Sequence, residues 1–235
     1  MSLRNWDNKT WLSSKRYIQS FNNFLLKQVK LNRNSKILDI GCGRGKILGS
    51  ISSRLKLKSK PIGIDIERHK DRDRRIHFKK VNAIDFIKKN KKKFDLIMIK
   101  QTIHLFKYQE IKKLIYACKM QLNQNGKILI LSLETSNNEI PTFLLMKKKL
   151  KKSLDRDKKI MRYISKLYPK NRNKRFLFKV KISRDKYIEM IKNRYISTLL
   201  DFSLHDIFQG IIQINIKYKK ILSFNDKLIC LILDK

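Results

Sequence analysis

The chain has 235 residues, of which 42% are hydrophobic, so it can bury a core and is not a disordered basic tail. No stretch of 18 apolar residues occurs, which predicts no membrane insertion, and the first seven residues lack the apolar core of a secretion signal. The three cysteines, Cys42, Cys118 and Cys230, are widely spaced and indicate neither a disulfide framework nor a zinc site. We therefore expect a cytoplasmic protein.

The 57 Lys and Arg residues outnumber the 19 Asp and Glu residues, which gives a formal charge of +38. Such an excess favours an anionic partner, with nucleic acid as the first candidate and acidic membrane lipid as another. The basic runs are scattered along the chain, at 88–93, 147–152, 170–175 and 217–220. A/T-rich codons, which enrich Lys, Ile and Asn together, explain such scatter without any function, and this alternative is the stronger one.

The first half of the chain alternates predicted strands and helices. Within residues 1–35, Tyr17, Phe21 and Phe24 recur at helical spacing and predict a helix. Apolar runs then predict strands at 36–40, 61–65, 76–81, 94–99 and 127–133. Amphipathic segments predict helices at 46–57 and 108–122, the second of them stopped by Asn125-Gly126. Near-continuous apolar strands that alternate with helices indicate a parallel sheet covered on both faces.

The pattern changes after Leu133. Residues 142–168 predict a long basic amphipathic helix or two, 176–182 a strand, and 183–195 a helix with Ser183 as N-cap. Residues 203–222 fit both strand and helix periodicity, but Ser203 with Asp206 three residues later resembles a capping box and favours a helix. A closing strand is predicted at 227–233.

No Gly-, Ser- or Pro-rich linker divides the chain, so we expect a single domain over residues 1–235 of the α/β class, with a doubly wound, mostly parallel sheet. Its expected parts are a helical flank, a ligand-binding core, a helical lid, and a closing helix and strand. They span residues 1–35, 36–137, 138–210 and 211–235.

The strongest chemical signal is the segment Asp39-Ile40-Gly41-Cys42-Gly43-Arg44-Gly45, which follows a predicted strand and precedes a helix. Glycines permit tight turns and close approach of a ligand, and a helix N-terminus can bind a carboxylate. The dinucleotide-binding fingerprint would need glycine at position 46, which is Lys46, and carries no acid two residues before its first glycine. Asp39 instead suits a ligand with an ammonium group.

Further polar residues follow the next strands. Asp65 ends the second strand, where an acid can bind both hydroxyls of a ribose. Asn82-Ala83 follows the third strand and could contact an adenine edge. The fourth strand leads into Lys100 and His104 at the carboxyl end of the sheet, where open α/β folds bind their ligands.

This ordered series resembles the class I S-adenosylmethionine-dependent methyltransferases. The motifs that carry the resemblance are 37–45, Gly63-Ile64-Asp65, Asn82-Ala83, 94–97 and 126–129. The resemblance covers residues 36–133. More loosely, the flanks Trp6–Trp11 and Tyr195–Leu199 are similar to the small-molecule, trans-aconitate-like (methyltransferase type 11) branch. Asn82 stands where the family usually has Asp.

The resemblance implies a seven-stranded Rossmann-like sheet with a helical insertion before the last strands, and a methyltransferase (EC 2.1.1.-) that uses S-adenosylmethionine. The glycine loop would hold the methionine part, with Asp39 near its ammonium group, Asp65 on the ribose and Ile66 against the adenine. The expected cofactor-binding set is Asp39, Gly41, Cys42, Gly43, Gly45, Asp65, Ile66, Asn82, Ala83 and Lys100.

Methyl transfer is an in-line displacement, in which a carboxylate acceptor needs no base but a hydroxyl or ammonium does. His104 is the candidate base, although a histidine there is as often a cap or packing residue. The candidate acceptor-binding residues are Trp11, Tyr17, His104 and Arg194. For Trp6, Trp11 and Tyr17, packing of the N-terminal helix is an equally open alternative. His69 and His77 are expected on the surface, and no histidine pair has metal-ligand spacing, so no metal is predicted.

Two enzymatic hypotheses remain. A small-molecule methyltransferase, acting on a carboxylate or hydroxyl, is favoured by the lid-like insertion and by residues 100–103, which differ from the Asn/Asp-Pro-Pro-aromatic motif of nucleobase amino-methylating enzymes. An RNA methyltransferase is favoured only by charge, and would need a basic stripe at the mouth of the active site. The third hypothesis is not enzymatic: the chain would be a basic adaptor that keeps the fold but catalyses no reaction. The oligomeric state is not predicted.

Overall fold

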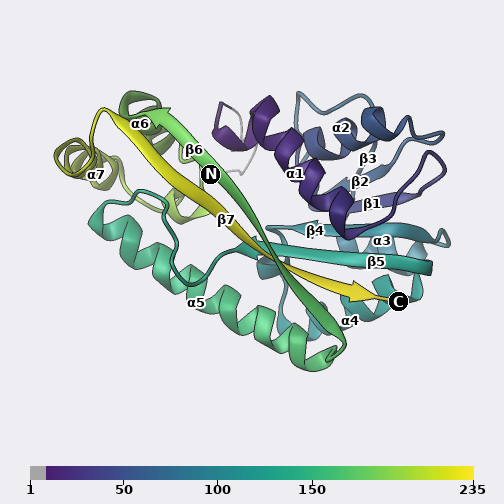
Figure 1. Ribbon diagram of the computed structural model, residues 1–235. Helices are drawn as coiled ribbons and strands as arrows, with labels where there is room; N and C mark the ends of the chain where they lie inside the picture. Colours follow the sequence, from purple (N-terminus) through teal and green to yellow (C-terminus); the bar gives the residue numbers. More distant parts are fainter. Residues whose placement is uncertain (1–8) are drawn as a thin grey trace.

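The apolar runs of the sequence form one seven-stranded sheet in the computed structural model, which describes residues 9–235 (Figure 1). The strands are β1 (Ile37–Ile40), β2 (Ile62–Asp65), β3 (His77–Lys80), β4 (Phe94–Lys100), β5 (Leu122–Leu133), β6 (Asn171–Ser183) and β7 (Ile221–Asp234). Their order is β3-β2-β1-β4-β5-β7-β6. Neighbours among β1 to β5 are parallel, whereas β7 is antiparallel to both β5 and β6. The predicted α/β class and mostly parallel seven-stranded sheet are confirmed.

Helices cover both faces of the sheet (Figure 1). They are α1 (Lys15–Gln28), α2 (Lys46–Leu55), α3 (Ala83–Lys89), α4 (Tyr108–Met120), α5 (Leu144–Leu167), α6 (Arg184–Lys192) and α7 (Leu204–Lys217). The side chains of α1 and α2 belong to one hydrophobic core, and those of α3 and α4 belong to a second. The central strand β4 serves both, because Leu96 and Met98 point into the first core while Ile97 and Ile99 point into the second. Over residues 9–235, no helix is long and apolar enough to cross a membrane.

Strands β6 and β7 form a two-stranded ribbon that is longer than the rest of the sheet (Figure 1). They pair from Asn171 opposite Leu233 to Ser183 opposite Ile221, whereas β5 pairs with β7 only as far as Leu228. The ribbon therefore continues beyond the end of β5 towards α6 and α7.

An aromatic cluster fixes α1 against this ribbon. The rings of Tyr17, Phe21 and Phe24 lie 5.5, 5.2 and 5.5 Å from the ring of Phe176 on β6. These three residues form the stripe at helical spacing that predicted the helix, and their partner lies on a strand some 150 residues away. The side chain of Tyr17 is fully buried, so Tyr17 packs the N-terminal helix against the ribbon, which was the alternative to a role in acceptor binding.

Two predicted helix starts are confirmed, and each has a hydrogen-bonded cap. The Ser183 hydroxyl accepts from the backbone N–H of Lys186. At the start of α7, the Asp206 N–H donates to the Ser203 hydroxyl at 3.0 Å, and the Ser203 N–H donates to the Asp206 carboxylate at 2.9 Å. This reciprocal pair decides the ambiguous segment in favour of helix.

The predicted end of the helix over 108–122 was wrong. Helix α4 ends at Met120, and β5 begins at Leu122, so Asn125-Gly126 lies inside a strand and does not stop the helix. A Cβ on Gly126 would lie 2.7 Å from the carbonyl oxygen of Phe94, so glycine is needed there for the close approach of β4. The expected lid, residues 138–210, contains the edge strand β6, and its end at 210 falls within α7.

We expect the substitution Phe176→Ala to lower the free energy of unfolding by about 3–5 kcal/mol, because it removes the ring on which three aromatic side chains of α1 pack. The neighbouring Leu177 is 56% exposed, so Leu177→Ala should cost less than about 1 kcal/mol. Urea denaturation of both variants measures the difference. Equal losses would show that α1 does not depend on this cluster.

Candidate functional site

A cavity of about 410 Å³ lies at the carboxyl ends of β1, β2, β4 and β5. The loops that follow these strands form one wall. The opposite wall comes from α5, from residues 195–198 and from β7. Open α/β sheets bind ligands at this edge, because the strand order changes direction there and the loops diverge.

The glycine loop between β1 and α2 is shaped for a closely approaching ligand. Gly41, Gly43 and Gly45 have φ angles of +74°, +54° and +70°, in the left-handed region that favours glycine. A Cβ on Gly41 would lie 2.1 Å from the Thr102 hydroxyl, so no larger residue fits. No side chain caps the start of α2, and its first-turn N–H groups face the end of the loop, where an anion can bind them.

Asp39, at the end of β1, is a buried carboxylate with one oxygen that accepts no hydrogen bond. It is 3% exposed, and its Oδ1 accepts no hydrogen bond. Burial raises the pKa of Asp39 to about 7; the nearby Lys100 opposes this shift and Asp65 adds to it. An ammonium group placed beside Asp39 would supply the missing donor and the missing positive charge.

Asp65, at the end of β2, holds the glycine loop. Its Oδ2 accepts from the N–H of Gly43 at 2.8 Å, and its Oδ1 accepts from the N–H of Glu67 at 3.0 Å. The next residue, Ile66, lines the cavity with a side chain that is 59% exposed. Asn82 also lines the cavity, where its Oδ1 caps α3 by accepting from the N–H of Ile84.

His104 lies beyond β4 beside a buried carboxylate from α5. Its Nδ1 is 3.9 Å from Oδ2 of Asp157 and makes no hydrogen bond. Asp157 accepts from the Ser132 hydroxyl at 3.0 Å and pairs with Arg156 at 3.3 Å. Burial lowers the pKa of His104; Asp157 opposes the shift and Arg156 adds to it. The imidazole is therefore neutral at pH 7 and can accept a proton.

Trp11 and a carboxylate of β7 form another part of the wall. The indole N–H of Trp11 donates to Oδ2 of Asp226 at 2.8 Å. Burial raises the pKa of Asp226, while Trp11 and Lys100 oppose the shift. Lys100 also lies 5.6 Å from the centres of the Tyr17 and Phe21 rings, so this cation bridges the aromatic cluster and the cavity.

Residues 31–192 match the family model described as a methyltransferase domain. The chain belongs to this methyltransferase family. No curated protein sequence matches it significantly.

Three solved structures share the fold at low sequence identity. The plantazolicin methyltransferase BpumL, in complex with a monoazolic desmethylPZN analog and SAH, is 18% identical, with 98% of this chain and 87% of that chain covered and a TM-score of 0.52. For the precorrin-6y C5,15-methyltransferase from Geobacter metallireducens GS-15 the identity is 12%, the coverages are 95% and 90%, and the TM-score is 0.53. A putative methyltransferase from an antibiotic biosynthesis pathway of Anabaena variabilis ATCC 29413 is 13% identical, with 89% of this chain and 95% of that chain covered and a TM-score of 0.65.

The protein is thus a class I S-adenosylmethionine-dependent methyltransferase, and the cavity fits its cofactor. Oδ1 of Asp39, which accepts no hydrogen bond, suits the ammonium group, and the uncapped start of α2 suits the carboxylate. The exposed apolar Ile66 offers a surface to the adenine. All ten residues of the expected cofactor-binding set line this one cavity. Burial raises the pKa of Cys42, whose thiol therefore stays protonated.

The expected acceptor-binding residues divide into two pairs. Trp11 and His104 line the cavity, whereas Tyr17 and Arg194 are not among its lining residues. The Arg194 guanidinium is buried and donates to the carbonyl of Leu199, so it stabilises a turn and does not face an acceptor. Trp6 lies outside the described residues. The surface prediction for His69 is wrong, since this side chain is 3% exposed and lines the cavity, whereas His77 is exposed as expected.

Two carboxylates of the methyltransferase cavity were not predicted, although the sequence holds a signal for each. Asp157 falls on the apolar face of α5, in line with Leu150, Leu154 and Ile164. Asp226 falls in the inward series of an alternating strand. Burial of an acid at an apolar, inward position costs free energy unless the acid is paired, so such an acid is a candidate functional residue. Both acids line the cavity.

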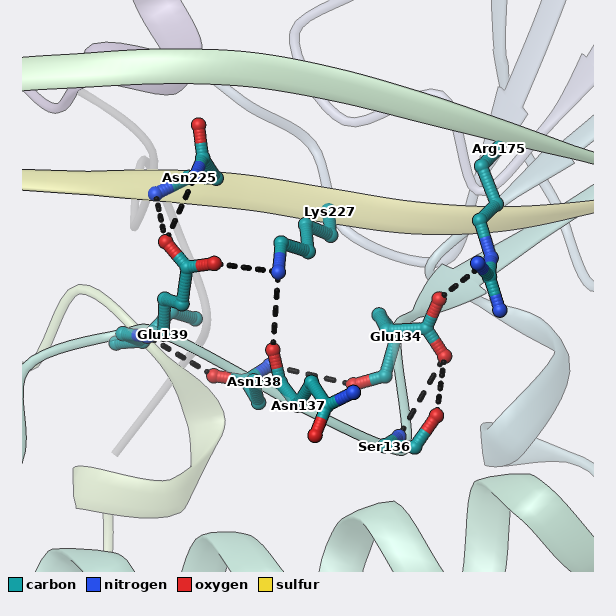
Figure 2. Close-up of polar contacts among 9 residues, drawn as sticks. Glu134, Ser136, Asn137, Asn138, Glu139, Arg175, Asn225 and Lys227 are labelled. Atoms are coloured by element: carbon teal, nitrogen blue, oxygen red, sulfur yellow. Dashed lines mark hydrogen bonds and ion pairs between the residues drawn. The ribbon is translucent and has the colours of Figure 1, made fainter.

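The segment that leaves β5 is fixed to the β6–β7 ribbon (Figure 2). Oε2 of Glu139 accepts from the backbone and the side chain of Asn225, at 2.9 and 2.8 Å, and its other oxygen pairs with Lys227. Glu134 pairs with Arg175 of β6 at 3.1 Å. These contacts hold the segment in place just before Ile140, a residue of the cavity wall.

We expect the affinity for S-adenosylmethionine to rise with pH through about 7, because the ammonium group binds the ionised form of Asp39 and the pKa of Asp39 is about 7 in the free protein. Binding near pH 7 should then release a proton from Asp39. Calorimetry in two buffers that differ in ionisation enthalpy measures this release. The variant Asp39→Asn should bind more weakly and lose the pH dependence, and an unchanged pH profile would place the ammonium group elsewhere.

Proposed function

We propose that this methyltransferase transfers the methyl group to a small-molecule acceptor, through a hydroxyl or a carboxylate oxygen. The observation that carries the proposal is the wall that α5 and residues 195–198 build opposite the cofactor-binding loops. Its apolar side chains include Leu150, Leu154 and Ile196. An acceptor of limited size can be enclosed there and shielded from water.

The chemistry needs few protein groups. S-adenosylmethionine supplies a methyl group activated by a sulfonium, so the acceptor oxygen forms the new C–O bond while the C–S bond breaks and its electron pair stays on sulfur. His104 would accept the proton of a hydroxyl acceptor, because its imidazole is neutral at pH 7. Asp157, 3.9 Å away, would stabilise the imidazolium that results.

A hydroxyl acceptor and a carboxylate acceptor differ in their need for this base. With a hydroxyl acceptor we expect His104→Gln to lower kcat by about 10²–10⁴-fold while the affinity for S-adenosylmethionine stays the same. His205, an exposed residue of α7, provides the matched control His205→Gln, which should be unaffected. Stopped-flow or initial-rate kinetics with labelled cofactor measures both. An unchanged kcat in His104→Gln would leave a carboxylate acceptor, which needs no base.

The acceptor class can be tested directly. Purified enzyme is incubated with methyl-labelled S-adenosylmethionine and either a metabolite extract or total RNA, in parallel and at physiological salt. Label in small molecules supports the proposal. Label confined to RNA would overturn it in favour of an RNA methyltransferase, the function that the charge of +38 suggested.

We also propose that residues 138–210 act as a lid within a single domain over residues 1–235. Its long helix, α5, contributes Leu150, Ser153 and Leu154 to the cavity wall, and the segment before it is anchored to β7. Hydrogen exchange in α5 should slow when S-adenosylhomocysteine binds, because closure protects the helix. Unchanged exchange in α5, together with slower exchange in the glycine loop, would show a rigid wall and no lid.

A further inference from the structure

Among the described residues, acids outnumber bases in the lining of the cavity, the reverse of the chain as a whole. Six of these lining residues are acidic, namely Asp39, Asp65, Glu67, Glu110, Asp157 and Asp226. Four are basic, namely Arg44, Lys46, Lys100 and Arg156, and the first of these pairs with Asp71. The whole chain has 19 acidic and 57 basic residues. About a third of the acids but fewer than a tenth of the bases of the chain thus lie among the described residues of the site.

Asp226 is the least expected of these acids. The inward positions of β7 around it are Leu222, Phe224, Leu228 and Cys230, all of them buried and apolar. Asp226 itself is 1% exposed. A carboxylate in such a series loses its hydration, so an apolar residue would make the strand more stable.

The position of Asp226 directs it at the acceptor side of the cavity. Leu228 pairs with Leu133, the last residue of β5, so Asp226 lies just beyond the carboxyl end of that strand. Its neighbours Asn225 and Lys227 point towards Glu139 on the segment before α5 (Figure 2). Successive side chains of a strand point to opposite faces, so Asp226 faces away from that segment, into the cavity.

The known contacts of Asp226 do not require its charge. The indole N–H of Trp11 donates to Oδ2, which a neutral amide oxygen could accept equally well. The positive charge of Lys100 is shared, because it acts on both Asp39 and Asp226. Among the described residues, Lys100 is thus the cation that acts on both of these buried carboxylates. With the cofactor's ammonium group beside Asp39, a protonated nitrogen of the acceptor would add a hydrogen-bonding cation at Asp226 itself.

We propose that Asp226 is the specificity residue that binds a protonated nitrogen of the acceptor, so that the substrates of this methyltransferase are small molecules with a basic amine attached to an apolar body. This rests on the proposed function, a small-molecule acceptor, and narrows its chemical class. The apolar body would contact Trp11, Ile140 and Tyr195, which line the cavity with Asp226. Salt-bridged, hydrogen-bonded recognition of this kind discriminates strongly against neutral and anionic analogues.

Three probes with the same phenyl group test the binding step: benzylamine, benzyl alcohol and phenylacetate, titrated at pH 7 into enzyme saturated with S-adenosylhomocysteine. We expect benzylamine to bind at least about tenfold more tightly than the other two, the scale of a charged hydrogen bond. In Asp226→Asn, which keeps an acceptor for the Trp11 indole, this preference should disappear while affinity for S-adenosylhomocysteine is unchanged. The matched control is Asp201→Asn, which removes the same charge from an exposed residue and should keep the preference.

Benzylamine binding no tighter than that of benzyl alcohol in the wild-type enzyme would overturn the assignment, and so would a full preference in Asp226→Asn. A second measurement does not depend on that variant. The labelled products of the metabolite extract are passed over a cation exchanger at neutral pH, where amine-bearing products are retained. Label in the unretained small molecules overturns the role of Asp226 but leaves the proposed function intact, whereas label in RNA alone overturns the proposed function itself.

Discussion

Burial of carboxylates at the carboxyl edge of the sheet is the constraint on which the site depends. Asp39, Asp157 and Asp226 come from β1, α5 and β7, and each is at least nine-tenths buried. A buried carboxylate is tolerated only where donors or cations compensate for its lost hydration. Asp157 has Ser132 and Arg156, and Asp226 has Trp11, but Oδ1 of Asp39 has no partner. Without a ligand, the negative charge of Asp39 is therefore not fully compensated by the protein, and a cationic ligand would compensate it.

The β6–β7 ribbon connects this edge to the rest of the molecule. On one side Phe176 anchors α1, whose preceding turn carries Trp11 into the cavity. On the other side Asn225 and Lys227 fix the segment that leads to α5. Because Asp226 lies between those two residues, the same stretch of strand positions the acceptor wall and contributes a charge to it. A change of register by one residue would turn Asp226 away from the cavity and Asn225 and Lys227 away from the segment that they hold. Function therefore requires the correct pairing of this ribbon.

All ten residues of the expected cofactor-binding set line the cavity, whereas of the expected acceptor-binding residues only Trp11 and His104 do. The loop after β1 and the acid after β2 are local patterns, so the residues that act together are close in the chain or follow successive strands. The wall that we propose for the acceptor combines Trp11, Ser132, Asp157 and Asp226, which only the tertiary fold brings together. Arg194 and Tyr17 illustrate the converse: each has a chemically suitable side chain, yet packing directs one to a carbonyl in a turn and the other into the aromatic cluster. Helix α7 was predictable because its capping box is local, whereas β5 already begins just after α4, where Leu122 pairs with Phe94 of β4, a partner far away in the sequence.

The separation of charge also makes a strongly basic chain compatible with the small-molecule activity that we propose. Residues on the outside face water and salt, where the interactions of single lysines are screened within about 10 Å, so an excess there has little effect inside the cavity. Within the cavity, fewer and partly buried groups act at close range in a less polar medium and therefore dominate selection of the ligand. The positively charged exterior repels cations at a distance, whereas the acidic groups of the cavity bind them at contact. For the cationic acceptor that we propose, salt would help entry, while Asp226 and its neighbours would set the affinity, so the two charge distributions would act on different steps of the same binding reaction.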